Sequence, residues 1–151
     1  MNCKKCNNLF FKIANEIWKL MPTEADKYIF ECEFHETISN FRMYWINNAG
    51  DECNYSVGCI PHEKRNILEL YENLKSEMKV NGSDWTQSRF VLNNDGTFDV
   101  KFAYIEEADS WPMLYLKGIS DLTKEEAENE YFVPLDIWEE RVRIKNKSKG
   151  E

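Results

Sequence analysis

Glycine and histidine are scarce in this chain, and it has no long apolar run. Only six of the 151 residues are glycine and two are histidine. The sequence has no Walker loop, no glycine-rich dinucleotide fingerprint and no His-Glu-x-x-His motif, which argues against nucleotide and zinc-protease chemistry. No apolar run approaches the roughly 20 residues that span a bilayer. The N-terminal segment carries Lys12, Glu16 and Lys19 instead of the apolar stretch of a signal peptide, so we expect a cytoplasmic protein without a membrane anchor.

The chain also lacks an excess of positive charge. It has 19 lysines and arginines against 27 aspartates and glutamates, for a net charge of −8 and a pI of about 4.9. Such a surface repels phosphate backbones, so we expect no direct binding to nucleic acid. It favours basic protein partners, because complementary charge speeds their encounter. The 42% hydrophobic content predicts one folded domain over residues 1–151, with flexible ends at 1–7 and 144–151.

The five cysteines do not form an obvious framework. An odd number in a chain without a secretion signal argues against disulfides. The Cys3-x-x-Cys6 pair could be half of a zinc site, but no second pair follows with standard knuckle spacing. The alternative is a set of free thiols with Cys32 in the core, and we expect no metal. Cys53, Cys59 or His62 could complete such a site with Cys3 and Cys6.

A cysteine hydrolase is conceivable, with Cys53 or Cys59 as nucleophile and His35 or His62 as base. No motif places these residues on a strained turn or beside an oxyanion hole. We therefore expect neither catalytic residues nor a cofactor.

Hydrophobic periodicity predicts an α+β fold. A first helix capped by Asn7 or Asn8 ends before Pro22, and a second helix begins at Pro61 and ends at Gly82. Two further helices are expected after Thr123 and Pro134. Strands are expected over residues 28–34, 40–47, 53–60, 85–93 and 97–105. Because short turns join consecutive strands, we expect an antiparallel sheet of four to five strands with helices packed on it, in the order helix, strands, helix, hairpin, helices.

The run Asn93-Asn-Asp-Gly-Thr-Phe-Asp-Val100 resembles a calcium loop at first reading. In EF-hand register, however, the first and twelfth positions fall on Val91 and Phe102, which cannot act as ligands. A two-residue turn at Asp95-Gly96 would mix apolar and charged residues on both faces of the hairpin. A three-residue loop with Gly96 in the left-handed region keeps one face apolar. The pattern therefore predicts a bulged turn, with the apolar face formed by Phe90, Leu92, Phe98, Val100, Phe102 and Tyr104.

Acidic residues gather in the last third of the chain. They could be catalytic or metal-binding, they could form an ordinary solvated face, or they could dock a basic protein. Trp111 and Tyr115 would supply aromatic anchors for docking. The predicted contact residues are Glu106, Glu107, Asp109, Trp111, Tyr115, Glu125, Glu126 and Glu130.

Short motifs over most of residues 9–110 carry a family resemblance. They are Ile13-Ala-Asn-Glu-Ile17, Met21-Pro22, Leu70-Tyr-Glu-Asn-Leu74, Trp85, Phe90-Val-Leu-Asn-Asn-Asp-Gly-Thr-Phe98 and Phe102-Ala-Tyr104 followed by acids. This pattern resembles the YezG-type bacterial immunity (antitoxin) family.

The resemblance implies a non-enzymatic protein that binds and neutralises a cognate toxin domain. The toxin would be secreted or delivered by contact, and the partner would be its C-terminal domain, commonly a basic nuclease. An alternative is a small acidic interaction or regulatory domain without a toxin partner, and an enzyme is the third reading.

Overall fold

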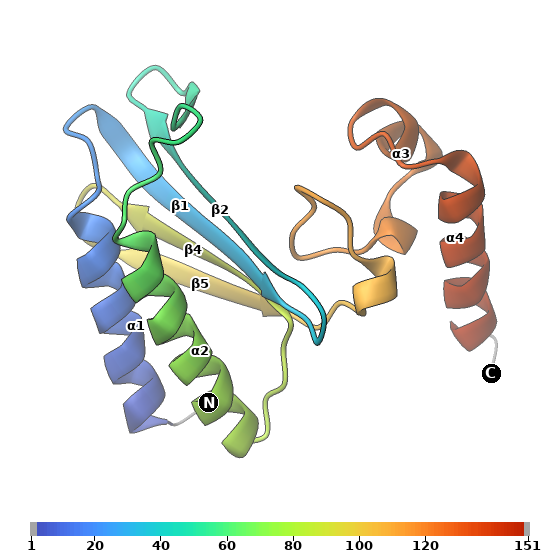
Figure 1. The fold of residues 1–151 in the computed structure, drawn as a ribbon, viewed down its shortest axis with the longest axis horizontal. Coiled ribbons are helices and arrows are strands. Elements are labelled where there is room, and N and C mark those ends of the chain that lie inside the picture. Colours follow the sequence, from blue (N-terminus) through green and yellow to red (C-terminus); the bar gives the residue numbers. More distant parts are fainter. Residues whose placement is uncertain (1–2, 150–151) are drawn as a thin grey trace.

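The computed structural model describes residues 3–149. A five-stranded antiparallel sheet has the strand order β3-β2-β1-β4-β5. Figure 1 shows α1 and α2 on one side of the sheet and the C-terminal helices on the other. The elements in chain order are α1 (Lys4–Trp18), β1 (Ala25–Phe34), β2 (Ser39–Asn47), β3 (Glu52–Asn54), α2 (Lys64–Val80), β4 (Gln87–Asn93), β5 (Phe98–Ala103), η1 (Glu107–Asp109), η2 (Ile119–Asp121), α3 (Lys124–Asn129) and α4 (Leu135–Lys149).

The predicted α+β class and antiparallel sheet are confirmed. β1 is the central strand, and its alternate residues Tyr28, Phe30 and Cys32 are fully buried beneath the helices. The buried stripe of α2 contains Ile67, Tyr71, Leu74 and Met78, at the spacing of one helix face. Trp85, just before β4, closes one end of this core and packs against Phe34, Tyr71 and Phe102.

The bulged hairpin is confirmed. Leu92 pairs with Phe98 and Phe90 with Val100, as the three-residue loop requires. Gly96 has a φ of 89°, in the left-handed region where a side chain is strained. Tyr104 is a correction, because it follows the last residue of β5 and its side chain is 62% exposed. The pairing that holds the other aromatic residues inward ends at Ala103.

Several element boundaries differ from those expected. The first helix begins at Lys4 with Cys3 as its N-cap, not at Asn7 or Asn8. The third strand is only three residues long, and α2 begins three residues after Pro61. Of the ends expected to be flexible, 4–7 and 144–149 are helical, whereas residues 1–2 and 150–151 lie outside the described part.

The C-terminal third forms a second, smaller core. Trp138 donates from Nε1 to the Leu122 carbonyl at 2.8 Å, which ties α4 to the segment before α3. Figure 1 shows α3 and α4 standing apart from the helices that cover the sheet. The buried residues of this second core are Leu114, Ile119, Leu122, Ala127 and Val133.

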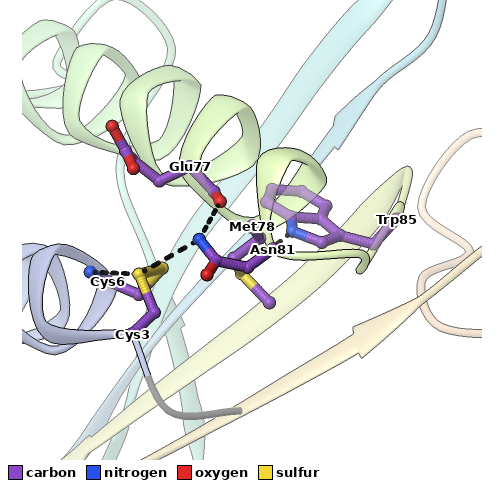
Figure 2. The surroundings of a disulfide bond; sticks show 6 residues. All are labelled: Cys3, Cys6, Glu77, Met78, Asn81 and Trp85. Atoms are coloured by element: carbon purple, nitrogen blue, oxygen red, sulfur yellow. Dashed lines mark hydrogen bonds between the residues drawn. A yellow bond between two sulfur atoms is a disulfide. The ribbon is translucent and has the colours of Figure 1, made fainter.

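Cys3 and Cys6 form a disulfide, which overturns the expectation of free thiols (Figure 2). Because α1 begins at Lys4, the two residues lie one turn apart, with Cα atoms 5.1 Å from each other. Cys3 Sγ also accepts a hydrogen bond from Asn81 Nδ2 at 3.5 Å, so the disulfide contacts the end of α2. The number of cysteines alone could not predict this bond, because it depends on a helix that begins at Lys4, with Cys3 as its N-cap.

We predict that the five cysteines fall into distinct reactivity classes. Cys59 is exposed, Cys53 is partly buried, and burial raises the pKa of the Cys32 thiol well above its usual value. In the folded protein, a chromogenic thiol reagent should react with Cys59 at once and with Cys53 more slowly. It should find three thiols in denaturant and five after reduction. A Cys3→Ser variant should give four in denaturant, and a wild-type count of five without reductant would rule out the disulfide.

Candidate functional site

Exposed acids gather in the segment after β5 and on and beside α3, whereas the second half of α4 is basic, with Arg141, Arg143, Lys145, Lys147 and Lys149. Residues 106–140 contain eleven aspartates and glutamates but only two lysines and no arginine. Glu106 has a side chain that is 69% exposed, and Glu125, Glu128 and Glu130 are exposed on and beside α3. These side chains can meet a basic partner without any rearrangement of the fold, because little covers them.

Glu107 has a different environment from its neighbour Glu106. Its carboxylate accepts hydrogen bonds from the Thr37 amide at 3.1 Å and from the Thr37 hydroxyl. These bonds lower the pKa of Glu107, because they stabilise its charged form. The side chain therefore links the β1–β2 turn to η1 and is only partly free for a partner.

Asp109 is a structural tie between the two parts of the molecule. Oδ1 accepts from the Ser120 amide at 3.0 Å and from Arg141 Nε at 3.2 Å, and Oδ2 accepts from the Ser120 hydroxyl at 2.7 Å. A Cβ at Gly118 would collide with this carboxylate, so the close approach requires glycine there. Asp109 thereby joins the segment after β5 to η2 and α4.

Trp111 and Tyr115 do not project as surface anchors. Trp111 packs against the second core and donates from Nε1 to the Tyr131 carbonyl at 2.8 Å. Tyr115 is buried against the sheet, and burial together with Glu33 and Glu31 raises the pKa of its hydroxyl. The sequence placed both beside the acidic cluster correctly, but it could not show that their rings turn inward.

Glu126 also serves the fold. It completes a capping box with Thr123, each side chain bonding the other residue's backbone N–H at 2.9 and 3.1 Å. Its carboxylate lies 3.6 Å from Lys117 Nζ. The hydrogen bonds from Thr123 lower the pKa of Glu126. Glu125 and Glu130 are exposed on either side of it.

Two carboxylates that the sequence reading missed lie buried on the other face of β1. Glu31 and Glu33 are 2% and 3% exposed. Glu31 lies in a row of charged residues that crosses four strands, Arg42, Glu31, Arg89 and Lys101. The available signal was the alternation of Glu31 and Glu33 with apolar residues, which places both on one face of a central strand.

Glu33 connects the sheet to the C-terminal segment. It accepts from Asn40 Nδ2 at 2.9 Å and from Gln87 Nε2 at 3.1 Å, and His35 Nε2 lies 3.3 Å away. Gln87 in turn accepts from the Leu116 amide at 2.6 Å. This relay of hydrogen bonds holds the segment around Leu116 over the open face of the sheet.

The candidate zinc residues are not brought together. Cys3 and Cys6 lie beside the end of α2, whereas Cys59 and His62 precede its start. The 17 residues of α2 span about 25 Å at 1.5 Å per residue. Cys59 is exposed and the His62 side chain is 95% exposed, so neither lies in an enclosed catalytic site. Within residues 3–149, no group of three or more His, Cys, Asp or Glu is arranged to hold a metal ion.

Comparison with known families identifies the scaffold. A family model described as "Immunity protein YezG-like" matches residues 6–117, about three quarters of the chain. The chain belongs to the YezG-like immunity protein family. The match contains all five strands and α2, and it ends at Lys117, before η2, α3 and α4. A search of curated proteins gives no match. No helix among the described residues is long and apolar enough to cross a membrane.

We expect Asp109→Ala to destabilise the protein by about 1–3 kcal/mol, because it leaves Ser120 and Arg141 without their shared acceptor. Urea denaturation measures the change. The matched control is Glu106→Gln, which alters an exposed carboxylate in the same segment and should stay within about 0.5 kcal/mol of wild type. Equal stability of the two variants would contradict the structural role of Asp109.

Proposed function

We propose that this YezG-like protein neutralises a cognate toxin domain by binding to it. Family membership carries the proposal, and the acidic surface of residues 106–140 supports it. The partner is the C-terminal domain of a secreted or contact-delivered toxin, and a basic nuclease fits the charge best. Such a domain carries positive charge where it holds its phosphate substrate. An acidic inhibitor associates with it rapidly, which matters because the free toxin is lethal.

The proposed contact surface consists of the acids that the fold leaves free. Glu106, Glu125 and Glu130 are exposed. Of these three, only Glu106 has a cationic partner within the described residues, Arg141 at 3.4 Å. Asp109, Trp111 and Tyr115 act behind this surface by fixing the backbone that presents it. No catalytic group is needed for inhibition by binding, and we place the encounter in the cytoplasm, where an incoming toxin meets its inhibitor.

Co-expression tests the function directly. Cells that express the toxin domain encoded beside this gene should survive only when the immunity protein is also present. The purified pair should bind with nanomolar or tighter affinity, and the association rate should fall steeply as salt rises. Cell death despite full expression of the folded immunity protein would end the proposal.

Charge reversal tests the surface. Glu125→Lys with Glu130→Lys should slow association about tenfold or more at low salt and leave the fold intact, because these side chains are exposed. The control is Glu69→Lys with Glu72→Lys on the exposed face of α2, on the opposite side of the sheet. Stopped-flow kinetics compares the two. An equal effect of both variants would show that only net charge matters and that this surface is not the contact.

A further inference from the structure

A cationic pocket lies between the open face of the sheet and the C-terminal segment. Its volume is about 360 Å³. The strands supply Glu31, Arg42 and Arg89, and the covering segment supplies Tyr115, Lys117 and Tyr131. Three cationic side chains and one carboxylate line it, although the chain as a whole carries a net charge of −8. The lining of the pocket thus has the opposite sign to the net charge of the chain.

Buried Glu31 holds the two guanidinium groups in place. Arg89 donates from Nε to Glu31 Oε2 at 2.8 Å, and its Nη2 lies 2.7 Å from the same oxygen. Arg42 Nη1 lies 3.6 Å from Glu31 Oε1, and the Arg42 guanidinium stacks over the Tyr44 ring at 4.1 Å. Because both arginines are fixed by neighbours, a ligand would not have to immobilise them, which favours tight binding.

The arginines retain donors for a ligand. A guanidinium has five N–H groups. Arg89 uses two of its nitrogens on Glu31, and Arg42 uses Nη2 on Glu52 at 2.7 Å. Both side chains are partly exposed. Acceptors for the remaining N–H groups are not found among residues 3–149, so these groups can bind an acceptor that enters the pocket.

The charge balance favours a carboxylate over a phosphate. Two arginines and Glu31 leave one unit of positive charge on the pocket floor, which matches a singly charged anion. Lys117 is already 3.6 Å from Glu126, and Glu52, which does not line the pocket, lies 2.7 Å from Arg42 Nη2. A doubly charged phosphate would meet these carboxylates without enough cations. A planar carboxylate also suits the fork geometry of arginine.

The pocket rim points to a protein as the source of that carboxylate. Met113 lines the pocket and is 58% exposed, although it is apolar, and Phe132, which follows the lining residue Tyr131 in the chain, is 76% exposed. Both have positive φ, 69° and 56°, as does Leu116 at 67°, and no other non-glycine residue within 3–149 does. Such backbone strain tends to persist at binding sites. An exposed apolar side chain in the lining of a charged pocket is typical of a protein–protein contact, where apolar groups shield a buried ion pair.

We propose that this pocket binds an Asp or Glu side chain of the toxin domain. This proposal rests on the function proposed above. It adds a specific ion pair to the long-range attraction between the acidic surface and a basic toxin. A basic toxin presents few carboxylates, so a pocket that accepts one of them selects the register of binding. Its floor belongs to the family-matched sheet, whereas Tyr131 lies beyond the match. Changes in the C-terminal segment would therefore reshape the pocket for a different toxin.

Arg42→Gln tests the pocket, and Lys101→Gln is the matched control. Both remove one positive charge from the same cross-strand row, but Lys101 lies outside the pocket. Arg42→Gln should weaken toxin binding about tenfold or more, whereas Lys101→Gln should change it less than about twofold. Met113→Asp, which places a negative charge on the exposed rim, should weaken binding more than Met113→Ser. Thermal denaturation checks that all four variants fold.

Coupling to the toxin identifies the occupant. One Asp→Asn or Glu→Gln change in the toxin should weaken binding to wild type but add nothing to Arg42→Gln, since both remove the same ion pair. Two results would overturn the pocket proposal but leave the proposed toxin neutralisation intact. One is equal toxin binding by the Arg42→Gln and Lys101→Gln variants. The other is an additive effect of Arg42→Gln with every toxin acid that is changed. Loss of protection by wild type would overturn both. Saturable binding of acetate alone at low millimolar concentration would instead assign the pocket to a free carboxylate.

Discussion

The burial of two carboxylates in the central strand constrains the arrangement of the whole molecule. A buried charge must be paired and hydrogen-bonded, since its desolvation is otherwise too unfavourable. Glu33 satisfies this requirement with hydrogen bonds from Asn40 and Gln87. Glu31 is paired with arginines on both neighbouring strands, but only its Oε2 accepts a hydrogen bond, from Arg89, and Oε1 has no hydrogen-bond donor among the described residues. Through Gln87 the same network reaches Leu116 and holds the C-terminal segment over the sheet. One side of β1 is thus the apolar core, and the other is the polar joint between the two parts of the protein.

This joint separates two kinds of charge. The outer surface after β5 is acidic, whereas the pocket beneath the covering segment is cationic. Exposed acids act over distance and mainly change the rate of encounter. Fixed arginines in a partly enclosed site act at contact, where a wrong partner would leave a charge unpaired. A protein with both features can attract basic domains in general and retain one of them.

The parts of the fold that follow from local pattern were predictable. Leu92 opposite Phe98 follows from alternation, because a slip of one residue would move charged side chains into the core. The α2 stripe and the Thr123 capping box follow in the same way from spacing. The inward turn of Tyr115, the tie made by Asp109 and the Cys3–Cys6 bond were not predictable. The first two depend on residues far away in the chain that the fold brings into contact. The third depends on where α1 begins.

The sequence by itself determined the class of the fold, the bulged hairpin and the acidic character of the last third of the chain. It did so because periodicity, turn chemistry and net charge are properties of neighbouring residues or of the total. Tertiary structure decided which acids remain free, since Asp109 and Glu126 have partners within the protein whereas Glu125 and Glu130 are exposed. It also brought Arg42 and Arg89 to the same glutamate from opposite sides of β1. Their separation of 47 positions along the chain carries no local signal, and only strand pairing makes them neighbours.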